Sequence, residues 1–151
     1  MPSAPIVMFL TGLASLFPRW TPFFMPNPVS PDRIWRNEVV MQSFINERVR
    51  EMGLAAGGLK FCLGTALALV RSLEAVKSET IPGLEVPFFV AHGTKDYGVP
   101  ITGSEYLLKH AKTSEEDRCV RFIDGAFHCL LSEDTRYDTV NAMVTWMDSR
   151  I

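Results

Sequence analysis

Residues 86–91 read VPFFVA and run into HGTKDYGVP at 92–100, and residues 119–123 read CVRFI and run into DGAFH at 124–128. The first run is short, apolar and bounded by turn residues, which is typical of a strand buried on both faces. The second run predicts another strand, ended by Asp124 and Gly125. These two strand–loop units decide the fold, because the helices predicted from residue 58 onward precede, separate and follow them.

Helical periodicity flanks both predicted strands. Apolar residues between 59 and 73 recur at helical spacing, residues 104–112 form a second plausible helix, and apolar residues between 137 and 147 lie on one face of a third. Ser132 is expected to cap the N-terminus of that last helix. Strand and helix therefore alternate, and this alternation predicts a parallel α/β architecture.

The first 57 residues have a different character. Large apolar side chains are frequent there, but prolines interrupt them at seven positions: Pro2, Pro5, Pro18, Pro22, Pro26, Pro28 and Pro31. Each proline removes a backbone donor and restricts the residue before it, so long regular elements are not expected. The composition fits a lid over a hydrophobic cavity, or a loop-rich layer that packs on its own core. We divide the chain into a cap or lid segment, 1–57, and a core, 58–151.

Bulk composition excludes several classes of protein. The 151 residues carry a net charge of −2 with acids and bases mixed, so nucleic acid is not an expected partner. Three cysteines at no metal-ligand spacing indicate free thiols in a reducing compartment and no metal. The apolar stretch 6–17 is shorter than the roughly 20 residues that span a bilayer. We therefore expect a cytoplasmic protein.

Asp96 and His128 are the candidate catalytic residues. In parallel βαβ units both loops leave the carboxyl edge of the sheet, and adjacent strands lie about 4.8 Å apart. Asp96 follows its strand by five residues, as does His128, so the side chains can meet. A carboxylate that accepts the imidazole Nδ1–H leaves Nε2 free to act as a base. Asp124 is the rival acid and is expected to serve the turn instead.

Purely structural roles are the alternative to this catalytic interpretation. His128 could be a structural histidine, and His92 and His110 are interpreted as structural, at a strand end and on a helix face. Cys62 and Cys129 are candidate thiol nucleophiles only in principle, since small buried cysteines are common.

The quoted segments, together with GSEYLL at 103–108 and GAFHCLLSE at 125–133, resemble the acid and histidine blocks of the α/β-hydrolases of the monoacylglycerol-lipase and serine-aminopeptidase branch. GGLKFCLGTALALV at 57–70 resembles the helix by which that branch re-enters its core after the cap. The resemblance covers the whole chain, most specifically 82–133. It implies the C-terminal part of an α/β-hydrolase fold, with Asp96 as triad acid, His128 as triad base and no cofactor.

Two motifs of that family are missing from the sequence. Its nucleophile sits in a G-x-S-x-G elbow, and this chain has none; Ser15 in GLASL comes nearest but lacks the flanking glycines. The family's oxyanion-hole motif is absent as well. We expect part of an enzyme that hydrolyses monoacylglycerol-like lipid esters. This partial chain retains the acid and the base but lacks the nucleophile, so it is expected to be inactive alone, and the missing N-terminal hydrolase half is its expected partner.

Two alternatives stay open: a non-catalytic lipid- or protein-binding module, and one half of a split hydrolase. The resemblance gives a lipid ester as the small-molecule partner and adds a membrane surface, reached through the cap, as a further partner. It leaves the substrate-binding residues unknown.

Overall fold

The computed structural model describes residues 4–25, 29–52 and 60–150. These residues fall into two compact units, one built from 1–28 and 58–80 and the other from 29–57 and 81–151. The chain passes between the units at three places: between residues 28 and 29, between 57 and 58, and between 80 and 81. The second of these is the predicted boundary, which lies outside the described residues, and the other two were not predicted. The units are defined by packing, whereas the predicted boundary separates a cap from a core by role, and that division stays a prediction.

The first unit contains two helices, α1 (Ala4–Leu16) and α3 (Leu63–Ala75). The expectation of irregular structure before residue 57 was wrong for α1 and for α2 (Glu38–Met52), which belongs to the second unit. Pro5 falls in the first turn of α1, where no intrahelical donor is needed, and Pro18 comes only after its end. The spacing between these prolines therefore leaves room for a helix of 13 residues.

The start of α3 is fixed by the proline-containing turn that follows α1. The amides of Leu63 and Gly64 donate to the carbonyls of Trp20 and Pro18, at 2.8 and 2.9 Å. These bonds satisfy two of the donors that a helix N-terminus leaves unpaired. Leu63 is fully buried, and an apolar cavity of about 250 Å³ lies between α1 and α3. It is lined by Val7, Leu10, Met25, Leu63, Ala66, Leu67 and Val70.

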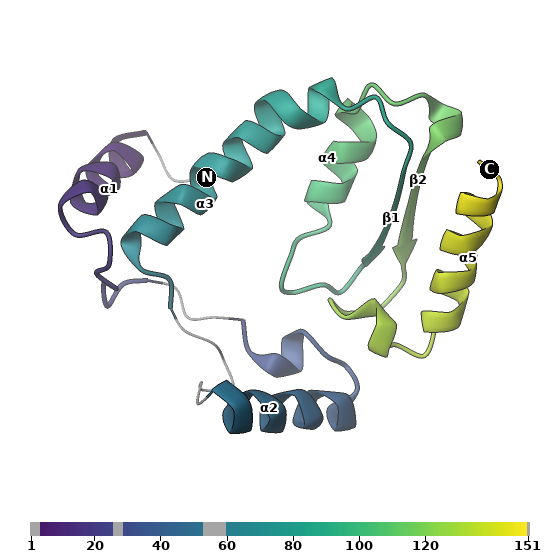
Figure 1. The fold of residues 1–151 in the computed structure, drawn as a ribbon, viewed down its shortest axis with the longest axis horizontal. Helices are drawn as coiled ribbons and strands as arrows, with labels where there is room; N and C mark the ends of the chain where they lie inside the picture. The colour runs from purple at the N-terminus through teal and green to yellow at the C-terminus, as the bar shows by residue number, and fades with distance from the viewer. Residues whose placement is uncertain (1–3, 26–28, 53–59, 151) are drawn as a thin grey trace. The chain divides into compact units, whose positions relative to one another are not determined.

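The second unit is built on two parallel strands, β1 (Phe88–Gly93) and β2 (Arg118–Ile123). The strand predicted at 86–91 is confirmed with its bounds two residues later, because Pro87 lacks the donor that a paired residue needs. Helix α4 (Thr102–His110) joins the strands, and α5 (Arg136–Asp148) follows β2. Figure 1 shows α4 and α5 on opposite faces of this sheet, as expected of a parallel α/β unit.

The short connections follow the sequence less closely. The chain after α3 continues through a π-helical turn, Val76–Thr80, into the 3-10 turn Ile81–Gly83 at the predicted break. The expected capping role of Ser132 was wrong. Ser132 ends the 3-10 turn Leu130–Ser132 and its hydroxyl donates to the carbonyl of Cys129, so that α5 begins only after Thr135. The Ser132 hydroxyl thus makes a local hydrogen bond to a backbone carbonyl instead of a capping bond at the start of α5. Two further 3-10 turns are Pro31–Arg33 and Glu115–Asp117.

Gly93, the last residue of β1, allows the two loops to approach each other. A Cβ atom at this position would lie 2.3 Å from the carbonyl oxygen of Ala126 and 2.5 Å from that of Phe127. Both distances are far below van der Waals contact, and both neighbours are backbone atoms, so a side chain would force the loops apart. The residue next to His92 must therefore be glycine for the loop that carries His128 to close onto β1.

We predict that Gly93→Ala lowers the free energy of unfolding by about 1–3 kcal/mol or more, as overpacking does. Gly103→Ala is the matched control, because a Cβ at Gly103 would meet nothing within 4 Å and alanine favours helix. Its stability should be unchanged or slightly raised. Denaturant unfolding of both variants, followed by circular dichroism, is the measurement. Equal midpoints for the two variants would contradict the close approach.

Candidate active site

The loops after β1 and β2 lie side by side at the carboxyl edge of the sheet. The register pairs Gly93 with Ile123, so both strands end at the same level. Beyond the strands, the amide of Thr94 donates to the carbonyl of Ile123 at 3.0 Å, and the amide of Lys95 donates to that of Ala126 at 2.9 Å. Backbone hydrogen bonds therefore continue the pairing into the loops and hold the two of them together.

Asp96 and His128 meet at the end of these loops. Nδ1 of His128 lies 2.8 Å from Oδ2 of Asp96, which is a short hydrogen bond between an imidazole and a carboxylate. The Asp96 side chain is only 5% exposed, whereas that of His128 is 42% exposed. With Nδ1 directed at the carboxylate, Nε2 is the nitrogen left for another partner. The structure brings the two predicted residues together in the predicted orientation.

The remaining oxygen of Asp96 is held by its own loop. The amides of Gly98 and Val99 both donate to Oδ1, each at 2.8 Å. Gly98 leaves space for this turn, since a Cβ there would come within 3.3 Å of Oδ1 and 3.6 Å of the His128 ring. The carboxylate is thus oriented before any substrate is present.

Burial on its own would raise the pKa of Asp96. The hydrogen bonds from Val99, His128 and Gly98, in that order, outweigh burial and hold the pKa below its usual value. Each of these donors favours the ionised carboxylate, which is the form that can accept a hydrogen bond from Nδ1–H of His128.

A lowered pKa in the folded state makes stability depend on pH. The contribution of Asp96 is complete above the pKa of the unfolded chain, about 3.9, and is lost as pH falls through the lower folded value. We predict that the free energy of unfolding declines more steeply with acidification below about pH 4 in the unmodified chain than in Asp96→Asn. Urea unfolding over this range measures it, and parallel declines would contradict the assignment.

Asp124, the rival acid, is engaged in a turn. Its Oδ1 accepts a hydrogen bond from the hydroxyl of Thr94 at 3.2 Å, and that hydroxyl accepts from the amide of Gly125 at 2.7 Å. Gly125 has φ +68°, a left-handed conformation that favours glycine. The carboxylate that contacts His128 is that of Asp96.

His92 also reaches the carboxylate, which sequence reasoning missed. Its Nε2 lies 2.9 Å from the carbonyl oxygen of Val99 and 3.2 Å from Oδ2 of Asp96. A carbonyl oxygen only accepts, so Nε2 carries a proton, and Nδ1 forms a hydrogen bond with the Ser104 hydroxyl at 2.7 Å. The signal was the spacing of His92 and Asp96 across the turn HGTKD. His110, by contrast, stacks on Tyr106 with ring centroids 4.0 Å apart.

The thiols differ in environment. Burial, followed by the charges of Asp96 and Glu133, raises the pKa of the Cys129 thiol, which opposes a role as nucleophile. The pKa of Cys62 is lowered, chiefly by its hydrogen bond with the Thr65 side chain. Cys62 lies at the start of α3, in the unit that does not contain Asp96 and His128.

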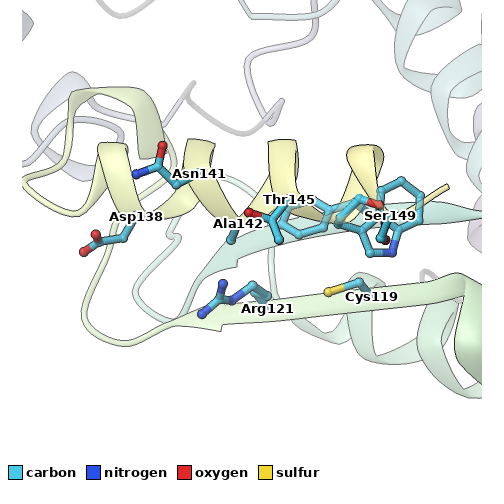
Figure 2. A pocket seen from close by; sticks show the side chains of 9 residues that line it. Cys119, Arg121, Asp138, Asn141, Ala142, Thr145 and Ser149 are labelled. Carbon is cyan, nitrogen blue, oxygen red and sulfur yellow. Dashed lines mark hydrogen bonds between the residues drawn. The ribbon is translucent and has the colours of Figure 1, made fainter. Parts of the chain in front are cut away.

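A groove of about 490 Å³ on the second unit is separate from Asp96 and His128. Figure 2 shows that side chains of β2, such as Arg121, and of α5, such as Asn141, line it from the body of these elements. Neither Asp96 nor His128 lines it. Within the described ranges, no group of three or more His, Cys, Asp or Glu side chains is placed to hold a metal ion. In the same ranges, no helix is both long and apolar enough to cross a membrane.

Parallel strands flanked by helices, with an aspartate and a histidine on loops at their carboxyl edge, define part of an α/β-hydrolase fold. The family described as serine aminopeptidase, S33, matches residues 1–135, and the chain belongs to this family of hydrolases. The predicted fold class is confirmed.

Comparisons with individual proteins agree with this family assignment. The chain is similar to caffeoylshikimate esterase of Arabidopsis thaliana, with 29% identity over 92 residues, which are 59% of this chain and 27% of the esterase. Its fold resembles a monoacylglycerol lipase of Paleococcus ferrophilus, with TM-score 0.69 and 20% identity over 99% of this chain and 54% of the lipase. A soluble variant of monoglyceride lipase from Saccharomyces cerevisiae, in complex with a substrate analog, gives TM-score 0.65 and 18% identity over 98% of this chain and 50% of that one. The chain thus spans about half the length of these solved structures.

Proposed function

We propose that this chain supplies the acid and base of a serine-type carboxylic-ester hydrolase, with Asp96 as acid and His128 as base. The observation that carries the proposal is the 2.8 Å hydrogen bond between Nδ1 of His128 and a carboxylate that two backbone amides already orient. Membership in a hydrolase family and resemblance to lipase folds support it.

The chemistry follows from the atoms of this pair. Asp96 accepts a hydrogen bond from Nδ1–H, which fixes the imidazole tautomer and leaves Nε2 unprotonated. Nε2 then takes the proton from a serine hydroxyl as the hydroxyl attacks the ester carbonyl, and later returns it to the leaving alcohol. Asp96 stabilises the imidazolium formed in between. The half-exposed ring of His128 is open to such a partner.

The serine belongs to the part of the hydrolase that this chain does not span. The sequence has no G-x-S-x-G elbow, and the chain covers 54% of the Paleococcus ferrophilus lipase. We propose that the elbow and the oxyanion donors lie in an N-terminal half, supplied either by the same polypeptide or by a partner.

The proposed substrate is a monoacylglycerol-like lipid ester. The two solved structures are lipases that act on such esters by name, and the cavity between α1 and α3 is lined with apolar side chains. An acyl chain requires a dry apolar lining of this kind. The same cavity also favours the second candidate function, a lipid-binding module that needs no serine.

We propose a peripheral contact with a membrane through the first unit of an otherwise cytoplasmic protein. Four exposed aromatic side chains pack edge to face in three contacts: Phe17 with Trp20, Trp20 with Phe24, and Phe24 with Phe23. Exposed apolar clusters of this kind mark interaction surfaces, and tryptophan and phenylalanine suit the boundary between headgroups and acyl chains.

The catalytic roles are tested by restoring the missing half. We predict that fusion to the N-terminal part of a monoacylglycerol lipase, which this chain does not span, gives hydrolysis of short-chain glyceryl esters. His128→Ala should abolish this activity. Asp96→Asn should lower turnover on the order of 10⁴-fold, because it favours the wrong imidazole tautomer. Asp124→Asn, a matched change on the same edge of the sheet, should alter turnover little. Initial rates measure all three variants.

Two outcomes would overturn the roles. One is an active fusion in which Asp124→Asn is the crippling change and Asp96→Asn is tolerated. The other is an active fusion that is indifferent to His128→Ala. A fluorophosphonate probe on the unfused chain is the baseline, since labelling of a serine there, abolished by His128→Ala, would place the nucleophile within these 151 residues.

The membrane contact gives a separate prediction. Phe23 is 89% exposed, so Phe23→Glu should preserve the fold while placing a charge where an acyl boundary would lie. Binding to phosphatidylcholine vesicles, measured by co-sedimentation, should fall by tenfold or more for roughly 1.4 kcal/mol lost. Tyr137→Glu, at an exposed aromatic residue of α5, should bind as the unmodified chain does. Equal binding of all three chains would refute this surface.

A further inference from the structure

The residues on either side of His128 are held by groups outside the strands. The amide of Phe127 donates to Oε1 of Glu133 at 2.7 Å, and the amide of Cys129 donates to the carbonyl of Ile34 at 3.2 Å. The backbone before and after His128 is therefore anchored at two points. Neither anchor belongs to the acid loop.

Glu133 is buried to an unusual degree for a carboxylate. Its side chain is only 4% exposed, and its second oxygen, Oε2, lies 3.2 Å from Nε of Arg36. A buried charge is tolerated where a counter-charge and hydrogen bonds replace water, and here Arg36 and the Phe127 amide provide both. The ion pair fixes the carboxylate that holds Phe127.

Arg36 also covers the loop itself. Its guanidinium lies 5.3 Å from the ring centroid of Phe127, over the ring face. A Cβ added to Gly125 would come within 3.4 Å of the same guanidinium. Arg36 therefore lies beside Gly125 at the start of the loop and against Phe127, the residue before His128. Through its ion pair it also contacts Glu133, which follows His128 in the chain. Arg36 and Ile34 come from the segment that begins the second unit, which the sequence had assigned to the cap.

We propose that Arg36 and Glu133 are positioning residues for His128: the ion pair clamps the loop so that the imidazole keeps its alignment with Asp96. This inference rests on the proposed function in taking His128 as the base. A base must stand within hydrogen-bond reach of the proton it takes, and a misplacement of about 1 Å can cost roughly 10²-fold in rate. Neither residue touches the reacting atoms.

The clamp is tested first on the full chain, without any activity. In Glu133→Ala the Phe127 amide loses its acceptor, so hydrogen–deuterium exchange in a peptide spanning 124–131 should accelerate at least tenfold, while exchange in β1 stays unchanged. Glu133→Gln should retain only part of the protection, because its amide oxygen still accepts from Phe127 but its side chain no longer forms the ion pair with Arg36. Arg36→Gln, at a half-exposed position, should accelerate the same peptide by freeing Glu133.

A matched control separates the clamp from ion pairing in general. Glu115 pairs with Arg118 at 3.3 Å, comparable to the 3.2 Å of the clamp, but its side chain is 93% exposed. Glu115→Ala should leave exchange at 124–131 as it is. If Glu133→Ala does not fold, Arg36→Gln decides, and unaltered exchange at 124–131 in that variant overturns the proposal. Uniform acceleration that includes β1 also overturns it, because a general loss of stability would then be the cause.

The second arm uses the fusion that restores the serine. Loss of alignment should lower kcat roughly 10²-fold in Glu133→Ala with KM nearly unchanged, and Glu133→Gln, which keeps only the bond from the Phe127 amide, should recover part of it. An unchanged kcat in a folded Glu133→Ala fusion refutes the positioning role. If the unmodified fusion is inactive, it is the proposed function that fails, and the exchange measurement still decides whether the clamp exists.

Discussion

The parallel, in-register pairing of β1 with β2 is the constraint on which the site depends. Because the strands end level at Gly93 and Ile123, their loops start from adjacent points and run in the same direction. Backbone hydrogen bonds then tie the loops together, and the absent side chain of Gly93 lets the carbonyls of Ala126 and Phe127 come close. A shift of the register by two residues would move one loop by roughly 6.6 Å and separate the carboxylate from the imidazole.

Asp96 is the electrostatic centre of the arrangement. One of its oxygens accepts two amides of its own loop, and the other faces the imidazoles of His128 and His92. These hydrogen bonds orient the carboxylate and favour its ionised form. His92 adds a link to Ser104 on α4, so the helix between the strands also supports the acid loop.

The histidine loop is supported from a different direction. Arg36, Glu133 and the carbonyl of Ile34 hold the residues that flank His128, and they come from segments far apart in the chain. Local turns hold Asp96, whereas the residues beside His128 are contacted by a long-range ion pair. This difference agrees with the compact units, in which residues 29–52 belong to the same unit as the two strands.

The sequence alone determined the parallel α/β class, the two strand–loop units and the pairing of Asp96 with His128, because each depends on short-range patterns and on the fixed geometry of parallel strands. It also separated Asp96 from Asp124, whose neighbour Gly125 predicted a turn. Only the tertiary structure decided that helices form between the prolines at 5 and 18, that His92 shares the carboxylate, and that Arg36 lies across the histidine loop. The reason is physical: an ion pair between residues 36 and 133 leaves no trace in local composition or periodicity, and its partners become neighbours only when the chain has folded.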